Sequence, residues 1–320
     1  MRLAVMGAGA VGRAVATLAG EYGHEVIGIA DSSGATLGEA LDVDAVLDRK
    51  TRTGSVGDDE PETLLDAEYD VLVEATPTTL GDAEPGFSHA VAAFERDRHV
   101  VLANKGPVAE RYEDLRAAEA ASAGELRFEA TVAGAIPAVH TVEDVGPARV
   151  ETVRGVLNGT ANFVLSRMAA EGLEYDHVLA EAQELGVAEA DPSFDVQGTD
   201  AALKCVIIAN VLREARDDLE GSLSLADAAV SGIDELPASA LELAANDGRT
   251  VRLIGEASPE RVRVGPRLLP ENGTLAVTGT QNIVQVETGH AGRLNLSGRG
   301  AGGPETASAV LSDVGRLSPN

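Results

Sequence analysis

A lysine and an aspartate one helical turn apart are the strongest candidates for chemistry in this sequence. In the segment LGVAEADPSFDVQGTDAALK, Asp200 and Lys204 are four residues apart, so a helix over 198–214 would place both on one face. A lysine surrounded by acids can hold its proton near neutral pH and deliver it to a reacting oxygen. Further carboxylates on the approach to this helix are available to bind the ammonium group of an amino-acid substrate: Glu189, Asp191 and Asp195.

The alternative is a solvent-exposed ion pair, which is common and worth only about 0.3–0.5 kcal/mol. Two observations favour the functional interpretation. Lys204 is one of three lysines in the chain, with Lys50 and Lys105. The flanking segment AALKCVIIANVL is also too apolar for a helix that faces water on one side.

Lys105 and Thr76 each follow a predicted buried strand, HVVLAN and YDVLVEAT respectively. Open α/β sheets bind their ligands at the carboxyl ends of parallel strands, so both residues are candidates for a ligand site. A connecting loop without a role is the alternative for each.

A glycine-rich turn at the start of the chain fits the pattern G-x-G-x-x-G. It follows the predicted strand 2–6 and opens a predicted helix over 11–23, and Asp31 ends the next predicted strand, 25–31. This context indicates a dinucleotide site, in which the helix N-terminus receives the pyrophosphate and an acid binds the adenosine ribose. The residues of the turn are Gly7, Ala8, Gly9, Ala10, Val11 and Gly12.

The choice between NAD and NADP stays open at this point. Asp31 would repel a 2′-phosphate and so favours NAD. Four residues that follow it can accommodate NADP if the loop folds over the site: Ser32, Ser33, Arg49 and Lys50.

The predicted elements indicate an α/β protein of two domains. Strands alternate with helices up to about residue 131, with further helices over 86–96 and 108–123 and a strand at LRFEATV, which predicts a Rossmann-type, doubly wound parallel sheet. The remainder begins with VRGVLNGTANFVLSRMAAEG, interpreted as a turn followed by an amphipathic helix. Further helices are predicted over 175–186 and 198–214, and strands at 249–257, 261–269 and 282–287, so we expect a second, mixed α+β catalytic and dimerisation domain. The predicted domains are 1–131 with 298–320, and 132–297.

The composition limits the classes of partner. A net charge of −27 argues against nucleic acid, because phosphate binding requires clustered Lys and Arg. No apolar run is long enough to span a membrane, and the apolar N-terminus is interrupted by glycines and Arg13, so we expect a cytoplasmic protein. An acid-rich, lysine-poor surface suits concentrated salt, which predicts a salt-loving source.

Several other signals predict no chemistry. The six histidines show no paired-ligand spacing, so catalytic zinc is not expected: His24, His89, His99, His140, His177 and His290. Cys205 lies within the apolar stretch and reads as a small buried hydrophobe rather than a nucleophile. The sequon Asn158-Gly159-Thr160 is interpreted as a chance match.

Taken together, the motifs resemble the homoserine dehydrogenase family over nearly the whole chain. They are GAGAVG, ANK, EATVAGAIP, GVLNGTANFVLSRM, AEADPSFDVQGTDAALK and GRGAGGPETASAV, in the family's order between residues 7 and 310. GVLNGTANFVL and AEADPSFDVQGTDAALK are the specific ones. The resemblance implies NAD(P)-dependent interconversion of L-aspartate 4-semialdehyde and L-homoserine in threonine, methionine and isoleucine biosynthesis.

The same resemblance implies roles for individual residues. Lys204 corresponds to the family's proton donor and Lys105 to its partner lysine, while Glu189, Asp195 and Asp200 correspond to the substrate-holding acids. Thr76 and Gly302 match cofactor contacts, and the tail helix is expected to return to the nucleotide domain. A monovalent-cation site, for sodium, is implied by the backbone carbonyls at Glu129, Val132, Gly134 and Ile136.

The family resemblance further suggests a homodimer formed through the second domain. Longer relatives carry a C-terminal ACT regulatory domain, for which this chain has no room, so feedback control through such a domain is not expected. Two rivals remain: an aspartate-semialdehyde dehydrogenase, which needs a thiolate nucleophile, and a non-catalytic nucleotide-sensing protein that retains only the Rossmann half.

Overall fold

The computed structural model describes residues 1–318, and the chain divides into two compact units. One unit is Met1–Ala135 together with the chain from Ala301 onward, and the other is Ile136–Gly300. The predicted boundaries follow residues 131 and 297, a few residues earlier in each case.

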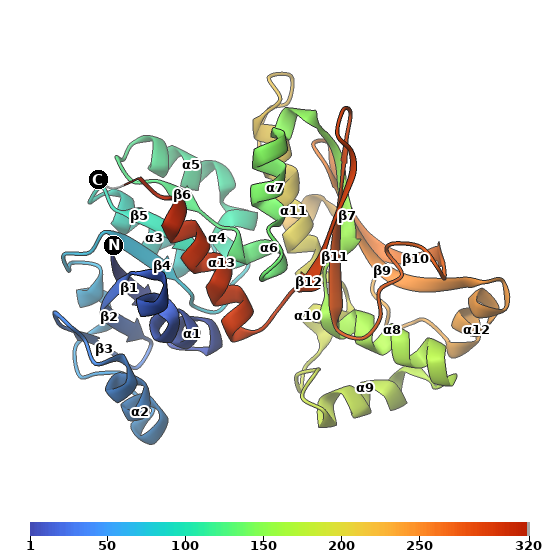
Figure 1. Cartoon of the computed structure of the whole chain (residues 1–320), viewed down its shortest axis with the longest axis horizontal. Helices are drawn as coiled ribbons and strands as arrows, with labels where there is room; N and C mark the ends of the chain where they lie inside the picture. Colours follow the sequence, from blue (N-terminus) through green and yellow to red (C-terminus); the bar gives the residue numbers. More distant parts are fainter. Residues whose placement is uncertain (319–320) are drawn as a thin grey trace. The chain divides into compact units, whose positions relative to one another are not determined.

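Within the described residues the first unit contains a six-stranded sheet in the order β3-β2-β1-β4-β5-β6 (Figure 1). Its strands are β1 (Arg2–Met6), β2 (Glu25–Asp31), β3 (Gly34–Leu37), β4 (Val71–Glu74), β5 (His99–Leu102) and β6 (Leu126–Arg127). All neighbouring pairs are parallel except β2 with β3, which is antiparallel. The direction of strand addition reverses between β1 and β4, and in doubly wound sheets ligands bind at this switch point.

The central strands β1 and β4 are mostly apolar because helices cover both faces of the sheet; the exceptions are Arg2, which begins β1, and Glu74, which ends β4. Leu3, Val5 and Val73 are fully buried. The helix α13 lies along α1, and together they bury Val15, Val310 and other apolar side chains in one core cluster (Figure 1). The helices of this unit are α1 (Ala10–Leu18), α2 (Val43–Thr53), α3 (Gly86–Phe94), α4 (Lys105–Glu110), α5 (Tyr112–Ala120), α6 (Ala130–Ala133) and α13 (Gly303–Arg316).

The second unit is built on another six-stranded sheet, counted over the described part of the chain, in the order β12-β11-β7-β9-β10-β8. Its strands are β7 (Val150–Val156), β8 (Ala228–Val230), β9 (Arg249–Ser258), β10 (Arg261–Pro270), β11 (Gln281–Thr288) and β12 (Gly292–Arg299). Its helices are α7 (Ala138–Val145), α8 (Gly159–Glu171), α9 (Tyr175–Glu184), α10 (Ser193–Val196), α11 (Thr199–Glu214) and α12 (Ala238–Asn246). The helix α11 packs on β9 and β10, and α8 packs on β9.

The α/β class and the two-part architecture are confirmed, but four local predictions were wrong. The stretch after Asp31 contains an antiparallel edge strand and the helix α2, which were missed. The helix predicted over 108–123 is divided at Arg111, and the strand predicted at LRFEATV ends at Arg127 before the short helix α6. The segment VRGV, interpreted as part of a turn, belongs to β7.

Along residues 1–318, none of the helices combines the length and the apolar character that crossing a membrane would require.

The turn between β1 and α1 depends on two glycines that touch. A Cβ on Gly12 would lie 1.7 Å from the carbonyl oxygen of Gly7, and Gly7 itself has a φ of +108°. Since two non-bonded atoms cannot approach so closely, Gly12 is what lets the first turn of α1 pack against the end of β1.

Replacing Gly12 with alanine should therefore lower the free energy of unfolding by about 1–3 kcal/mol, the usual cost of overpacking. Gly20→Ala is a matched control in the same unit, because no atom of the described residues lies within 4 Å of a Cβ at that position. Thermal unfolding followed by circular dichroism measures both variants. Equal melting temperatures for the two would contradict the proposed close contact.

Candidate active site

Lys204 lies on a helix that is buried on all sides. Lys204 is only 6% exposed, and its neighbours on α11 from Ala201 to Leu212 are all buried. The ammonium nitrogen Nζ donates to Asp200 Oδ2 at 2.6 Å and to the backbone carbonyl of Leu157 at 2.7 Å. Among the described residues, these contacts account for two of its three N–H donors, so one remains for a ligand. The surface-pair alternative is therefore wrong for Asp200 and Lys204.

The Asn158 side chain connects two of the predicted acids. Its Nδ2 donates to Asp195 Oδ1 at 2.7 Å and to Asp200 Oδ2 at 2.9 Å. Its Oδ1 accepts from the backbone N–H of Ala161, which caps the start of α8. The asparagine thus holds Asp195 and Asp200 at a common point, and Asp200 in turn holds Lys204.

The other two acids of this segment are arranged differently. The Glu189 side chain is exposed, beyond the end of α9. Asp191 is also exposed, and its carboxylate accepts from the backbone and hydroxyl of Ser193 in a local turn, which lowers its pKa. Asp195, by contrast, is half-buried beside Asn158.

Cys205 faces the sheet rather than a ligand. A Cβ on Gly255 of β9 would lie 2.5 Å from Cys205 Sγ, so the thiol fills the space above that glycine. Burial raises the pKa of the Cys205 thiol to about 12. A thiolate nucleophile at neutral pH is therefore not available at this position, which removes the basis for the phosphorylating-dehydrogenase rival.

The glycine turn of the first unit lies at the switch point between β1 and β4. A Cβ on Gly7 would lie 2.8 Å from the backbone nitrogen of Thr76, two residues after the end of β4. At Gly9, the N-cap of α1, a Cβ would meet no described atom within 4 Å, so this backbone borders open space. No side chain among residues 1–318 caps α1. A pyrophosphate fits these features, because unpaired helix N–H groups and the helix dipole attract anions.

Thr76 and Lys105 lie at the carboxyl ends of β4 and β5 and are linked through Asn104. Asn104 Nδ2 donates to Thr76 Oγ1 at 3.1 Å, and Asn104 Oδ1 caps α4 by accepting from the backbone of Gly106 at 3.0 Å. Lys105 is the first residue of α4 and is half-buried.

Gly302 is the N-cap of α13, with a φ of +123°. A Cβ on the next residue, Gly303, would lie 2.8 Å from the carbonyl oxygen of Ala10. The start of α13 is thus next to Ala10 and Val11 at the start of α1, and two helix N-termini lie side by side beside the glycine turn.

At the end of β2, Asp31 is ion-paired with Lys50 of α2. The two charged atoms are 2.6 Å apart, and Lys50 Nζ also donates to Ser33 Oγ at 3.1 Å and to the Gly54 carbonyl at 2.6 Å. Burial opposes ionisation of Asp31, but hydrogen bonds from Lys50 and Ser33 outweigh it and lower its pKa. The segment after Asp31 folds back on that residue. Two of the four residues considered for NADP, Ser33 and Lys50, thereby contact the Asp31 carboxylate.

The backbone positions predicted for a monovalent cation follow β6. The Glu129 carbonyl accepts from the N–H of Val132 at 3.2 Å, Gly134 ends α6 with a φ of +56°, and the Ile136 carbonyl accepts from Ala138 at 2.8 Å. No group of three or more acidic, histidine or cysteine side chains suited to a metal ion exists between residues 1 and 318.

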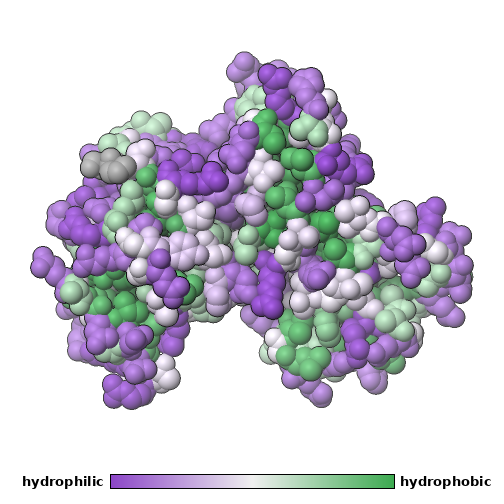
Figure 2. Space-filling view, viewed as in Figure 1, coloured by the Kyte–Doolittle hydropathy of each residue, from purple (hydrophilic) through white to green (hydrophobic). Residues whose placement is uncertain are grey.

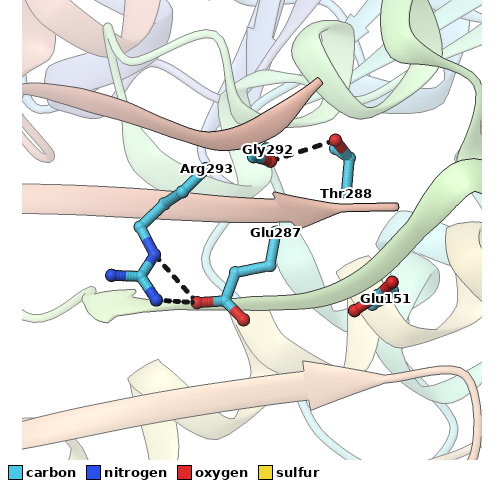
Figure 3. Close-up of a pocket in the computed structure, with 5 residues that line it drawn as sticks. All are labelled: Glu151, Glu287, Thr288, Gly292 and Arg293. Carbon is cyan, nitrogen blue, oxygen red and sulfur yellow. Dashed lines mark hydrogen bonds and ion pairs between the residues drawn. The ribbon is translucent and has the colours of Figure 1, made fainter. Parts of the chain in front are cut away.

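A pocket of about 290 Å³ lies elsewhere in the second unit, at the hairpin of β11 and β12 (Figure 3). Glu151, Thr288 and Gly292 line it together with Glu287 and Arg293, whose carboxylate and guanidinium are ion-paired at 2.6 Å. None of the predicted site residues lines this pocket.

Two residues of these sites were missed from the sequence. Asn158 was set aside as a chance sequon, although it directly precedes α8 in one of the family-specific motifs. Glu74, a fully buried carboxylate that ends an apolar strand, was also missed. A charged residue within an otherwise apolar run was the available signal for Glu74.

A doubly wound sheet with a glycine turn at its switch point, joined to a unit with a buried lysine–aspartate pair, defines a dinucleotide-dependent oxidoreductase. Comparison with known families agrees with this class. The model described as the NAD-binding domain of homoserine dehydrogenase matches residues 7–129, and the model described as homoserine dehydrogenase matches residues 137–314. The chain belongs to the homoserine dehydrogenase family.

Individual relatives cover almost the whole chain. A homoserine dehydrogenase from Methanocaldococcus jannaschii is 36% identical over 98% of this chain and 97% of its own length. The crystal structure of a putative homoserine dehydrogenase from Archaeoglobus fulgidus has a TM-score of 0.89 and 39% identity, over 98% of each chain. A hyperthermophilic archaeal homoserine dehydrogenase in complex with NADPH has a TM-score of 0.82 and 28% identity, over 100% of this chain and 98% of that one.

Proposed function

We propose that Lys204 is the general acid and base of an NAD(P)-dependent homoserine dehydrogenase, which interconverts L-aspartate 4-semialdehyde and L-homoserine. One observation carries this assignment. A lysine ammonium is buried on an apolar helix, bound to a carboxylate, with one N–H left to donate.

When bound, the dinucleotide would supply the hydride that the aldehyde carbon takes up in the direction of reduction. Lys204 donates a proton to the oxygen as negative charge develops there, so that the C=O group becomes CH–OH. Its positive charge also stabilises that oxygen in the transition state. In the direction of oxidation the same step runs in reverse, so Lys204 starts as the neutral amine and accepts the hydroxyl proton to become the ammonium.

The surrounding residues hold the substrate and the lysine. Asp200 and the Leu157 carbonyl fix the position of Lys204 Nζ. We propose that Asp195 and Glu189 bind the substrate ammonium group, and that Asn158 orients Asp195 through its hydrogen bond to Oδ1. Lys105 is proposed as the second lysine of the reaction, at the end of β5 where Asn104 caps its helix.

Lys204→Ala should lower kcat for homoserine oxidation by at least about 100-fold, the lower end of the range for a positioned acid. Lys204→Arg keeps the charge but cannot exchange a proton near neutral pH, so it should be comparably slow. Absorbance at 340 nm measures the rate, and circular dichroism checks that each variant is folded. A kcat within twofold of the wild type in Lys204→Ala would exclude the assignment, and rescue by added methylamine would support it.

For the cofactor, we propose that the site accepts both dinucleotides and that Lys50 favours NADP(H). The ion pair with Lys50 offsets the negative charge of Asp31, which would otherwise repel a 2′-phosphate. The ammonium of Lys50 and the hydroxyl of Ser33 are the donors that a phosphate at this position would use. The residues proposed to contact the dinucleotide are Gly7, Gly9, Ala10, Val11, Gly12, Asp31, Thr76, Lys105 and Gly302.

Lys50→Ala should reduce kcat/KM for NADP(H) about tenfold or more, because the 2′-phosphate loses a charge-assisted hydrogen bond. The value of kcat/KM for NAD(H), which has no 2′-phosphate, should change less than about threefold. Arg52→Ala removes an equal charge from the exposed side of the same helix and serves as the control. Parallel losses for the two cofactors would show that Lys50 only supports the fold.

We also propose that the protein is adapted to concentrated salt. Hydrophilic residues are spread over both units (Figure 2), and the net charge of −27 implies strong self-repulsion in dilute buffer.

The melting temperature should therefore rise steeply between about 0.1 M and 2 M NaCl, since the Debye length shrinks from about 10 Å to a few ångströms. A melting temperature that does not depend on salt would contradict this adaptation. Choline chloride, with a bulky cation, separates general screening from the binding of small cations.

The remaining proposals come from the family resemblance and the composition. They are a homodimer formed through the second unit, a sodium ion bound by backbone carbonyls at Glu129, Val132, Gly134 and Ile136, action in the cytoplasm, and no nucleic-acid or membrane partner. The substrate is a small molecule.

A further inference from the structure

Glu74 is a fully buried carboxylate that the mechanism above does not use. It ends β4, in the centre of the first sheet, and has an exposed fraction of 0%. Its Oε1 accepts from the backbone N–H of Thr76 at 2.9 Å and from the Thr76 hydroxyl, and its Oε2 is 2.6 Å from His89 Nδ1. Burying a carboxylate is costly even when it is paired, and a buried ion pair is weak evidence for stability. A role in positioning is the more direct explanation for a charge at this point.

His89 reaches Glu74 from α3 because that helix approaches the strand ends closely at Gly86. A Cβ on Gly86 would lie 2.6 Å from Asn104 Nδ2, so the absence of a side chain there lets α3 approach. His89 is three residues further on and faces the same side of the helix. The helix therefore touches the end of β4 through His89, and through Gly86 it touches Asn104, two residues after the end of β5.

Between these two contacts, the Thr76 hydroxyl has a fixed orientation. It donates its proton to Glu74 and accepts from Asn104 Nδ2 at 3.1 Å. Its single proton is thus committed, and a ligand at Thr76 meets an oxygen lone pair rather than a donor.

The place of Thr76 in the sheet indicates which part of a dinucleotide it would contact. Asp31 ends β2, on the adenosine side of the switch point, and the Thr76 backbone borders Gly7 on the opposite side. Dinucleotides cross this point, so the nicotinamide half lies over β4 and β5. The nicotinamide carboxamide has an NH2 group, which can donate a hydrogen bond to the Thr76 hydroxyl oxygen.

We propose that Glu74 and His89 are a positioning pair, which holds the Thr76 hydroxyl as a hydrogen-bond acceptor for the nicotinamide carboxamide. The inference rests on the proposed dinucleotide site and adds to it two residues that do not touch the ligand. His89 fixes the second oxygen of Glu74, Glu74 fixes Thr76, and Asn104 links Thr76 to the start of the helix that carries Lys105.

The test compares ligands with and without the nicotinamide. In His89→Ala, the affinity for NADPH and NADH measured by calorimetry should fall about tenfold, the effect of losing the hydrogen bond between Thr76 and the nicotinamide carboxamide. The affinity for ADP-ribose and its 2′-phosphate should change less than about twofold, because these ligands lack the nicotinamide. His89→Asn places an amide near the position of Nδ1 and should restore most of the NADPH affinity.

His99→Asn is the matched control. His99 is a buried histidine at the start of β5, at the opposite end of the strand from Asn104, and it accepts from the backbone of Glu125 at 3.1 Å. The His99→Asn variant should leave the ratio of the affinity for NADPH to the affinity for ADP-ribose unchanged. Thr76→Val removes the hydroxyl while keeping the shape, so it should reproduce the selective loss even if His89→Ala does not fold.

Equal losses for both classes of ligand in His89→Ala, or an unchanged affinity ratio in Thr76→Val, would overturn the positioning role. Failure of the wild type to bind ADP-ribose would instead contradict the dinucleotide site itself. The two failures are therefore distinguishable.

Discussion

The central constraint in this molecule is the burial of one positive charge on an apolar helix. Lys204 lies on α11, whose residues from Asp200 to Leu212 are all buried. An isolated ammonium in such surroundings would be strongly destabilising, so its partners are a requirement of the fold as much as of the chemistry. The Leu157 carbonyl is available because β7 ends at Val156, and Asp200 is available because the helix begins one turn earlier.

Much of the second unit follows from keeping these partners together. Asn158 is at once the cap of α8 and the donor to Asp195 and Asp200, so the start of one helix is tied to the start of another. On the other side of α11, Gly255 leaves room for Cys205 and lets β9 approach closely. A larger residue at Asn158 or at Gly255 would displace α11, the helix that carries Lys204.

The outline of the fold was readable from the sequence because its signals are local. Apolar runs predicted β1, β2, β4 and β5, and the charged pair within an apolar segment predicted a buried site on α11. The edge strand β3 and the helix α2 were missed because both are short or polar and are held by long-range contacts, such as the ion pair of Lys50 with Asp31. The break at Arg111 was equally invisible, because both flanking segments favour helix.

For the site, the residues involved were partly predictable from the sequence, but the hydrogen bonds between residues far apart in the sequence were not. The spacing of Asp200 and Lys204 is a property of one helix, whereas the bond from Asn158 to Asp200 joins residues 42 positions apart. The same holds for Glu74 and His89, whose contact requires α3 to approach the strand ends at Gly86. Such contacts depend on tertiary packing, which residue spacing does not encode directly.

The pairing of α13 with α1 has a consequence for how the chain is made. The nucleotide unit combines Met1–Ala135 with a helix that begins at Gly303, and that helix completes the core cluster containing Val15 and Val310. During translation, the first 135 residues therefore leave the ribosome without the helix that covers α1, while the unit Ile136–Gly300 is contiguous and can fold as soon as it emerges. The unit that contains Lys204 is thus the part of the protein able to mature first, and the nucleotide unit must wait until α13 has been synthesised.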